Sequence, residues 1–157
     1  MSKSLKRVKS ALFIADPTLE IIETGQATTA KAAAESLGCA VDQIAKSILF
    51  EGALSGALYL FVTAGARQVD LERAALLADE PLGKTDAARI RAVTGFAIGG
   101  VSLVGHLTEI STFFDEALLN YPKIYAAAGT PIHVFGCAPQ QMAELCRGRI
   151  SAFSREM

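Results

Sequence analysis

Hydrophobic positions recur at helical spacing in several segments of the chain, beginning near its N-terminus. Leu5, Val8 and Leu12 fall on one side of a helix and the early lysines on the other, so residues 3–15 are predicted to form an amphipathic helix. Capping residues and glycine stops predict three more helices, and apolar spacing predicts a last one. These helices cover residues 30–37 (capped by Thr28 or Thr29), 71–78 (capped by Asp70), the segment from Thr85 or Asp86 to 94, and 139–146.

Short apolar runs of the β type lie between these helices. They cover residues 19–22, 44–50, 58–63, 110–114, 124–128, 132–135 and 150–153. The run at 58–63 is apolar on both faces, which is typical of a central strand. Helices and strands mix without a regular βαβ rhythm, and no linker or internal repeat divides the chain. The pattern predicts a mixed α/β (α+β) fold with a sheet at its core, in a single domain that spans residues 1–157.

Composition supports a folded protein with an ordinary core. Hydrophobic residues make up 51% of the 157 positions and charged residues 20%, which excludes an extended disordered chain. The longest apolar runs are far shorter than a membrane-spanning helix, and Asp16 and Pro17 interrupt the apolar stretch that follows the early lysines. Three cysteines (Cys39, Cys137 and Cys146) have no metal-ligand spacing. Their scatter predicts reduced thiols and a cytoplasmic protein.

The charge balance limits the classes of partner. The formal net charge is −1, so no global positive field attracts a polyanion, as it does in proteins that coat nucleic acids. A protein that grips only the end of a tRNA needs no such field, because a local patch is enough. The charge therefore argues against generic DNA binding and leaves recognition of an RNA end open.

Lys46 is the first candidate for chemistry. Along its predicted strand it shares a face with Ile48 and Phe50, so the lysine stands at the start of a face that is expected to pack inward. Burying an ammonium is costly unless an anion or a carbonyl receives it. A strand-end lysine whose stem lies on the core while its amine reaches water is the structural alternative.

A Gly-rich stretch, residues 95–105, is the second candidate. Its segment from Gly99 to His106 resembles a backbone cradle for a ligand, because glycines allow close approach and turn N–H groups outward. Gly100 and Gly105 have the outer spacing of a P-loop, but His106 and Leu107 replace the required Lys and Ser/Thr. Neither a GxGxxG nor a GxSxG motif is present. A Gly-rich turn between strands is the structural alternative.

The segment from Ala126 to Pro131 is the third candidate. Its small residues followed by Gly129 suit either the floor of a pocket or a tight hairpin turn. The two histidines, His106 and His133, lack any partner at zinc spacing. Asp115 and Glu116 are explained equally well by a site and by the start of a helix.

Four segments, in this order and spacing, carry a family resemblance. They are TAKAAAESLGCAVDQIAKSILF (29–50), FVTAGARQVDLERAALL (61–77), TGFAIGGVSLVGH (94–106) and FDEALLNYPKIYAAAGTPIHVF (114–135). Together they resemble the YbaK/prolyl-tRNA-editing-domain family, whose free-standing members are aminoacyl-tRNA deacylases. The resemblance implies a compact fold with a curved, largely antiparallel central sheet. It also implies trans-editing, in which mischarged aminoacyl-tRNA is hydrolysed at its 3′ ester without metal, cofactor or covalent intermediate.

The resemblance also assigns roles to residues. It implies catalytic roles for Lys46, Gly99 and Gly100, and a proton shuttle by the ribose 2′-hydroxyl. It implies substrate binding by Val101, Ser102, Leu103, Gly105, His106, Ala128, Gly129, Thr130 and His133. The partners implied are the acceptor end of a mischarged tRNA and an aminoacyl-tRNA synthetase, with neither membrane nor duplex DNA expected.

One departure from the family pattern leaves a second interpretation open. Leu103 stands where the family's Gly-x-x-x-Pro loop carries proline, which is compatible with an inactive tRNA- or synthetase-binding module of the same fold. The basic N-terminal helix suggests a nucleic-acid-binding regulator. The net charge and the lack of a helix-turn-helix argue against that reading.

Overall fold

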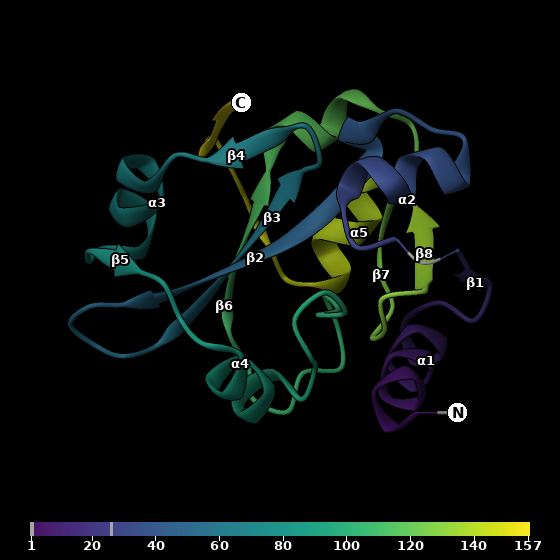
Figure 1. The fold of residues 1–157 in the computed structure, drawn as a ribbon, viewed down its shortest axis with the longest axis horizontal. Coiled ribbons are helices and arrows are strands. Elements are labelled where there is room, and N and C mark those ends of the chain that lie inside the picture. Colours follow the sequence, from purple (N-terminus) through teal and green to yellow (C-terminus); the bar gives the residue numbers. More distant parts are fainter. Residues whose placement is uncertain (1, 26) are drawn as a thin grey trace.

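The structure, a computed structural model, describes residues 2–25 and 27–157 and packs helices around a large twisted sheet (Figure 1). Four helices begin and end where the sequence predicts, because their caps are local, and the last one ends at Leu145, one residue earlier than predicted. The Thr29 hydroxyl accepts the Ala32 N–H, Asp70 and Asp86 cap two more helices, and Gly38 and Gly95 end helices in the left-handed conformation. The α-helices are α1 (Lys3–Ala15), α2 (Ala30–Leu37), α3 (Leu71–Ala78), α4 (Ala87–Thr94) and α5 (Pro139–Leu145), and the 3₁₀ turns are η1 (Val41–Gln43) and η2 (Glu116–Asn120).

Among the described residues, eight strands form the main sheet and two form a small one. The main sheet contains β1 (Ile21–Glu23), β2 (Ile44–Gly52), β3 (Leu58–Ala64), β5 (Leu82–Gly83), β6 (Ser111–Asp115), β7 (Ile124–Ala127), β8 (His133–Cys137) and β9 (Arg149–Ser151). Its order is β1-β8-β7-β2-β3-β6-β9, with β5 on the far end of β2. The pairs β1–β8, β7–β8, β2–β3 and β2–β5 are antiparallel, whereas β2–β7, β3–β6 and β6–β9 are parallel. The predicted mixed α/β class with a mostly antiparallel sheet is confirmed.

Three short strands were not predicted from the sequence. β5 adds two residues to the end of β2, and β4 (Arg67–Val69) pairs with β10 (Ser154–Glu156) in the small sheet. The last predicted strand, 150–153, is displaced: β9 ends at Ser151, and Phe153 is instead fully buried between β9 and β10. An isolated pair of three-residue strands has no periodicity of its own, so only the fold brings them together.

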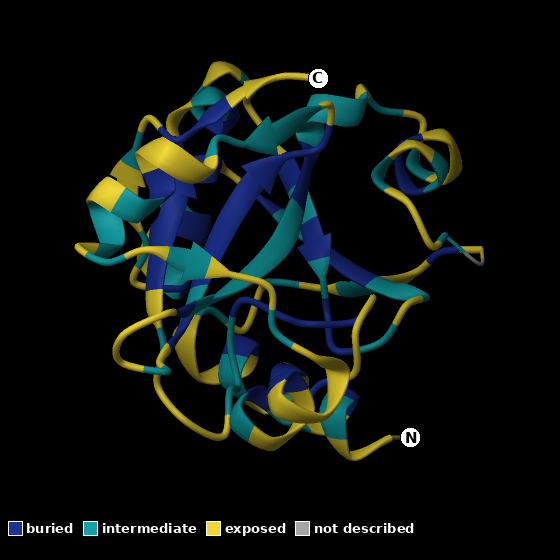
Figure 2. Ribbon diagram, turned by 60° about the vertical axis from the view of Figure 1, so that its left-hand side comes forward, coloured by how far each residue is buried: buried dark blue, intermediate teal, exposed yellow. Residues whose placement is uncertain are grey.

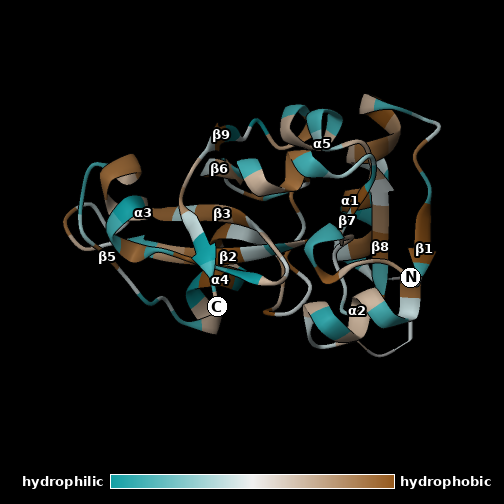
Figure 3. Ribbon diagram, turned by 90° about the horizontal axis from the view of Figure 1, so that it is seen from above, coloured by the Kyte–Doolittle hydropathy of each residue, from teal (hydrophilic) through white to brown (hydrophobic). Residues whose placement is uncertain are grey.

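The sheet separates two apolar clusters, and the residues of β3 alternate between them. Leu60 and Val62 lie in the larger cluster, against α1 and α5, whereas Phe61 lies in the smaller one with Phe113 and Phe153. Figure 2 shows the buried strands inside the molecule, and Figure 3 shows hydrophobic residues along β3. The central position predicted for β3 is confirmed.

The face of β2 that carries Lys46 packs as predicted. Ile48 and Phe50 are partly buried against the smaller cluster, and the Phe50 ring meets the Phe61 ring edge-on at 5.9 Å between centroids. No helix in the described part of the chain is long and apolar enough to cross a membrane.

Candidate active site

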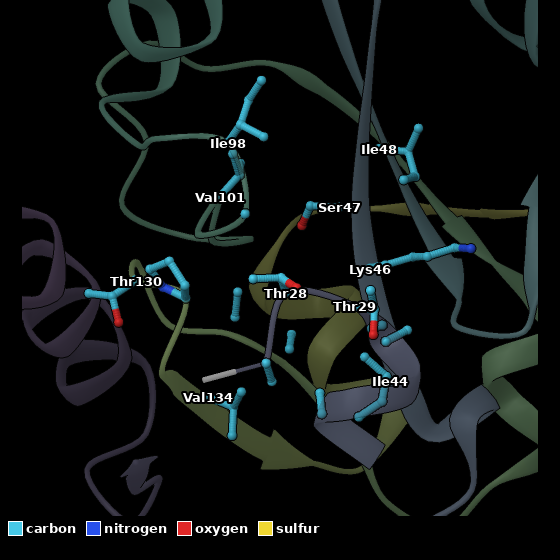
Figure 4. Close-up of a pocket in the computed structure, with 18 of the residues that line it drawn as sticks. Thr28, Thr29, Ile44, Lys46, Ser47, Ile48, Ile98, Val101, Thr130 and Val134 are labelled. Carbon is cyan, nitrogen blue, oxygen red and sulfur yellow. The ribbon is translucent and has the colours of Figure 1, made fainter. Parts of the chain in front are cut away.

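A cavity of about 510 Å³ opens beside β2, where the sheet splits. β2 pairs with β7 only through Ile44 and Ala45, and beyond that point the two strands diverge. The start of α2, the Gly-rich loop (residues 95–105) and the connection between β7 and β8 close the remaining sides (Figure 4). The volume falls within the range of small-molecule sites.

The β2 wall is an open strand edge. Between Ala45 and Glu51 the described residues provide no strand partner on the side opposite β3, and pairing resumes only at β5. An open edge presents backbone N–H and C=O groups that a ligand can bind. The Ser47 hydroxyl points from this wall toward the Gly-rich loop in Figure 4, in the opposite direction from the Lys46 side chain.

Lys46 contributes to the lining of the cavity and is partly buried, but its side chain extends away from the other labelled lining residues in Figure 4. Its Nζ donates to the Gly65 carbonyl oxygen at 3.3 Å, which is the carbonyl receptor expected for a buried amine. Burial lowers the pKa of the Lys46 amine below its ordinary value, and the nearby carboxylates of Asp42 and Asp115 oppose that shift. Asp115 is itself fully buried and accepts the backbone N–H groups of Ala64 and Ala117, both at 3.0 Å.

The opposite wall, the Gly-rich loop, contains neither helix nor strand and is held by α1. Arg7 donates from Nε to the Gly105 carbonyl at 3.1 Å and from Nη2 to the Gly95 carbonyl at 2.6 Å. Its guanidinium also lies 4.8 Å from the centre of the Phe96 ring. One side chain from α1 thus binds both ends of the loop.

His106 closes the same loop from inside. Its Nε2 donates to the Ser102 carbonyl at 2.5 Å, and its ring meets Phe96 edge-on. Burial lowers the pKa of His106, and the charge of Arg7 lowers it further. The neutral ring therefore stabilises the loop through its hydrogen bond to Ser102 and its contact with Phe96.

The Gly-rich loop and the turn between β7 and β8 are in contact at Gly100. A Cβ on Gly100 would lie 2.9 Å from the Thr130 Cα, so the two backbones are in direct contact. Next to this contact, the Thr130 hydroxyl lies 2.6 Å from His133 Nδ1. The pair places an imidazole and a hydroxyl on the cavity wall.

The structure divides the predicted site residues into two groups. The residues that line the cavity are Lys46, Gly99, Val101, Thr130 and His133. The others, Gly100, Ser102, Leu103, Gly105, His106, Ala128 and Gly129, are absent from its lining and form the loop and turn behind it. Leu103 is only 3% exposed and packs in the larger apolar cluster, so this residue anchors the loop in the core.

The sequence did not single out several polar side chains of the cavity as site residues. Ser47 lies on the opposite strand face from Lys46, and Thr28 was considered only as a helix cap. Thr85 also lines the cavity, and its buried hydroxyl has no hydrogen-bond partner among the described residues. A hydroxyl beside an apolar strand gives no sequence signal, because the cavity exists only after β2 and β7 diverge.

Other nucleophiles are occupied or protonated. The Ser102 hydroxyl is buried and accepts the Val104 N–H at 3.2 Å. Burial raises the pKa of both Cys137 and Cys146 to about 11, so both thiols stay protonated at neutral pH. Within residues 2–25 and 27–157, no three His, Cys, Asp or Glu side chains are placed to hold a metal ion. The cavity can thus hold a ligand against backbone groups, hydroxyls and an imidazole.

Comparison with known proteins places this architecture in a family. Residues 24–145 match the aminoacyl-tRNA editing domain. Over 99% of both chains, a candidate trans-editing enzyme for prolyl-tRNA synthetase shares 38% identity with a TM-score of 0.91. A scaffold protein used for computational epitope grafting shares 37% identity over the full length of both chains, with a TM-score of 0.92. The uncharacterised YwhH of Bacillus subtilis (strain 168) is 25% identical over 128 residues, which cover 82% of this chain and 80% of YwhH. The chain therefore belongs to the aminoacyl-tRNA editing domain family.

Proposed function

We propose that this protein is a trans-editing hydrolase that removes the amino acid from mischarged aminoacyl-tRNA. The observation that carries the proposal is the cavity beside β2, which lies within the segment that matches the editing domain. Its volume of about 510 Å³ suits an aminoacyl-adenosine end. The cavity is also open to solvent on one side, so the rest of a bound tRNA can extend out of it.

The proposed reaction is hydrolysis of an ester that is already activated. A water oxygen bonds to the carbonyl carbon, the bond from that carbon to the ribose oxygen breaks, and a proton passes to the ribose oxygen. The products are a free amino acid and an uncharged tRNA. The protein's task is to orient the water and to stabilise the negative charge that develops on the carbonyl oxygen.

Backbone groups of the Gly-rich loop are proposed to meet that charge. Gly99 faces the cavity with φ of +90°, a conformation that glycine adopts at little cost. Fixed N–H groups that point at the developing oxyanion need no reorganisation during the reaction. The clamp made by Arg7 holds the loop in place for this role.

Lys46 is proposed to hold the substrate's 3′ end. Its amine points away from the other labelled lining residues in Figure 4 and has a carbonyl partner at 3.3 Å, so the flexible stem must turn from Gly65 to reach a phosphate or carbonyl oxygen of the substrate. Desolvation by the bound substrate strengthens this contact. Ser47, Thr28 and the Thr130–His133 pair provide further hydrogen bonds for the ribose, the amino group or the water.

Hydrolysis of a panel of mischarged tRNAs tests this function. The panel carries alanine, serine, cysteine or threonine on several tRNAs, and wild type is compared with Lys46→Ala at equal concentrations of folded protein. We expect turnover of one or two members, lowered about 100-fold or more by the substitution. Full activity in Lys46→Ala contradicts the role of the lysine. A folded wild type that turns over no member supports the alternative, a binding module of the same fold.

A further inference from the structure

Helix α1 carries a one-sided row of positive charge. Lys3, Lys6 and Lys9 recur every third residue, all three are exposed, and the helix contains no acidic residue. None of the three forms an ion pair within the described part of the chain. This concentration of cations stands out against a whole-chain net charge of −1. The row, called the α1 lysine row below, has no role in the site described above.

The opposite side of α1 is already occupied. Leu5, Val8 and Leu12 are buried in contact with the protein, and Val8 and Leu12 belong to the larger apolar cluster. A basic amphipathic helix binds a membrane through a continuous apolar face, and that face of α1 is buried here. Phe13 and Ile14 in the last turn are exposed (69% and 84%), but they point about 100° apart on a helical projection and form no such face. The lysines therefore suit a partner that recognises charge alone, and a nucleic-acid backbone is such a partner.

Position connects the α1 lysine row to the cavity. A Cβ on Gly129, in the turn between β7 and β8, would lie 2.9 Å from the Ser4 carbonyl oxygen of α1. Figure 1 shows α1 beside that turn, and Arg7 ties the helix to the Gly-rich loop. Both loops that enclose the cavity thus rest on the helix that carries the lysines.

A second hollow leads from the cavity to α1. It measures about 710 Å³ and shares Ala27, Thr28, Thr130, Pro131 and His133 with the lining of the cavity. Its remaining wall includes Leu5 of α1 and Ser2, the residue that caps this helix. On a helical projection these two residues lie on the same flank as Lys6 and Lys9. A chain that leaves the cavity through this hollow therefore meets the lysine row.

We propose that the α1 lysine row binds phosphates of the tRNA acceptor stem while the 3′ end occupies the cavity. This inference rests on the proposed function, since it takes the cavity as the site of the aminoacylated end. Three lysines spaced three residues apart span about 9 Å along the helix axis, with flexible stems that reach further. Such contacts position a nucleic acid without reading its sequence.

Binding of uncharged tRNA tests the proposal without any need for hydrolysis. We compare the wild-type chain with the triple variant Lys3→Gln, Lys6→Gln and Lys9→Gln. A control triple, Arg147→Gln, Arg149→Gln and Arg155→Gln, removes the same charge from exposed positions outside the lining of both hollows. In the α1 triple, we expect the Kd for an RNA hairpin ending in single-stranded CCA to rise about tenfold at low salt. The slope of log Kd against log salt should flatten by about 2–3.

Two further comparisons distinguish a role of the α1 lysine row in RNA binding from effects on folding and on catalysis. A triple Lys→Arg variant keeps the charges and is expected to bind RNA like wild type. With a charged substrate, the ratio of kcat/KM for full aminoacyl-tRNA to that for the short aminoacyl-adenosine ester should fall about tenfold in the α1 triple only. If no ester is hydrolysed but the hairpin binds through the α1 lysine row, the proposed hydrolase function is wrong, whereas the proposed RNA-binding surface is supported.

Three outcomes overturn the proposal. One is unchanged RNA binding in the α1 triple, with an unchanged salt slope. The second is an equal loss in the control triple, which makes the effect one of net charge. The third is tighter binding to vesicles containing anionic lipid than to tRNA, lost in the same α1 triple, which assigns the row to a membrane surface.

Discussion

The two walls of the cavity face the same space but are built differently. The β2 wall belongs to a regular ladder in which seven consecutive residues of β2 pair with β3. The Gly-rich wall has no regular structure, and its shape depends on Arg7 from α1, on His106 and on buried Leu103. Regular pairing leaves a backbone edge free for a ligand, whereas irregular backbone must be held by contacts from elsewhere. We therefore expect substitutions behind the loop to affect stability and activity together.

Among substitutions that test this difference between the two walls, Leu103→Ala is expected to have the largest effect on stability. Leu103 is 3% exposed, so its truncation leaves a cavity and should lower the free energy of unfolding by about 2–5 kcal/mol. Leu107→Ala is the matched control, because Leu107 is 62% exposed and its truncation should change stability by about 0.5 kcal/mol or less. Urea unfolding measures both. Equal losses from the two variants would show that Leu103 does not anchor the loop.

Arg7→Met should remove the clamp on the loop. Two charge-assisted hydrogen bonds to the carbonyls of Gly95 and Gly105 are lost, at an expected cost of about 2 kcal/mol in stability. Hydrolysis should fall as well, because the loop amides lose their fixed orientation. Arg7→Lys keeps the charge but not the two-pronged geometry, and should recover little of either. Thermal unfolding and single-turnover hydrolysis give the two readouts, and full recovery by lysine would mean that charge alone matters.

Gly100→Ala addresses the contact between the two irregular segments. The new methyl group would stand 2.9 Å from the Thr130 Cα, so the loop and the turn must separate, at an expected cost of about 1–2 kcal/mol. Gly83→Ala in β5 is the control, since a Cβ there meets nothing within 4 Å. Unfolding free energies of the two variants check the difference. A neutral Gly100→Ala would mean that the contact is loose.

The smallest expected effect is a pH dependence that arises from His106. Its folded pKa lies below the ordinary 6.5, so the unfolded chain binds more protons as the pH falls below that value. The contribution is fully present above pH 6.5 and is lost as the pH falls from there toward the folded pKa. His106→Gln should flatten the stability profile in that window. A profile that keeps its slope in His106→Gln would assign the dependence to other groups.

How much the sequence reveals also differs between the two walls. Helix caps such as Thr29 and Asp86 and the alternation of β2 are local signals, and they located α2, α4 and the strand that carries Lys46. The pairing of β10 with β4 joins segments about 85 residues apart, and neither segment has a sequence pattern that predicts the pairing. The hydrogen bonds from Arg7 to the loop could not be predicted from the sequence either, because α1 meets the loop only in the folded chain. Ser47 and Thr28 could not be predicted as lining residues either, because the cavity that they line forms only in the folded chain.

The central claim is that the cavity beside β2 receives the aminoacyl-adenosine end of tRNA. Its most direct test is an NMR titration with non-hydrolysable aminoacyl-adenosine amides that carry alanine, serine, cysteine or threonine. We predict that at least one amide shifts backbone signals from both walls, including those of Ser47, Gly99 and Val101. The signals of Gly83 and Arg155, which lie outside the cavity lining, should stay in place. Shifts confined to residues outside the lining, or no shift with any of the four amides, would contradict the claim.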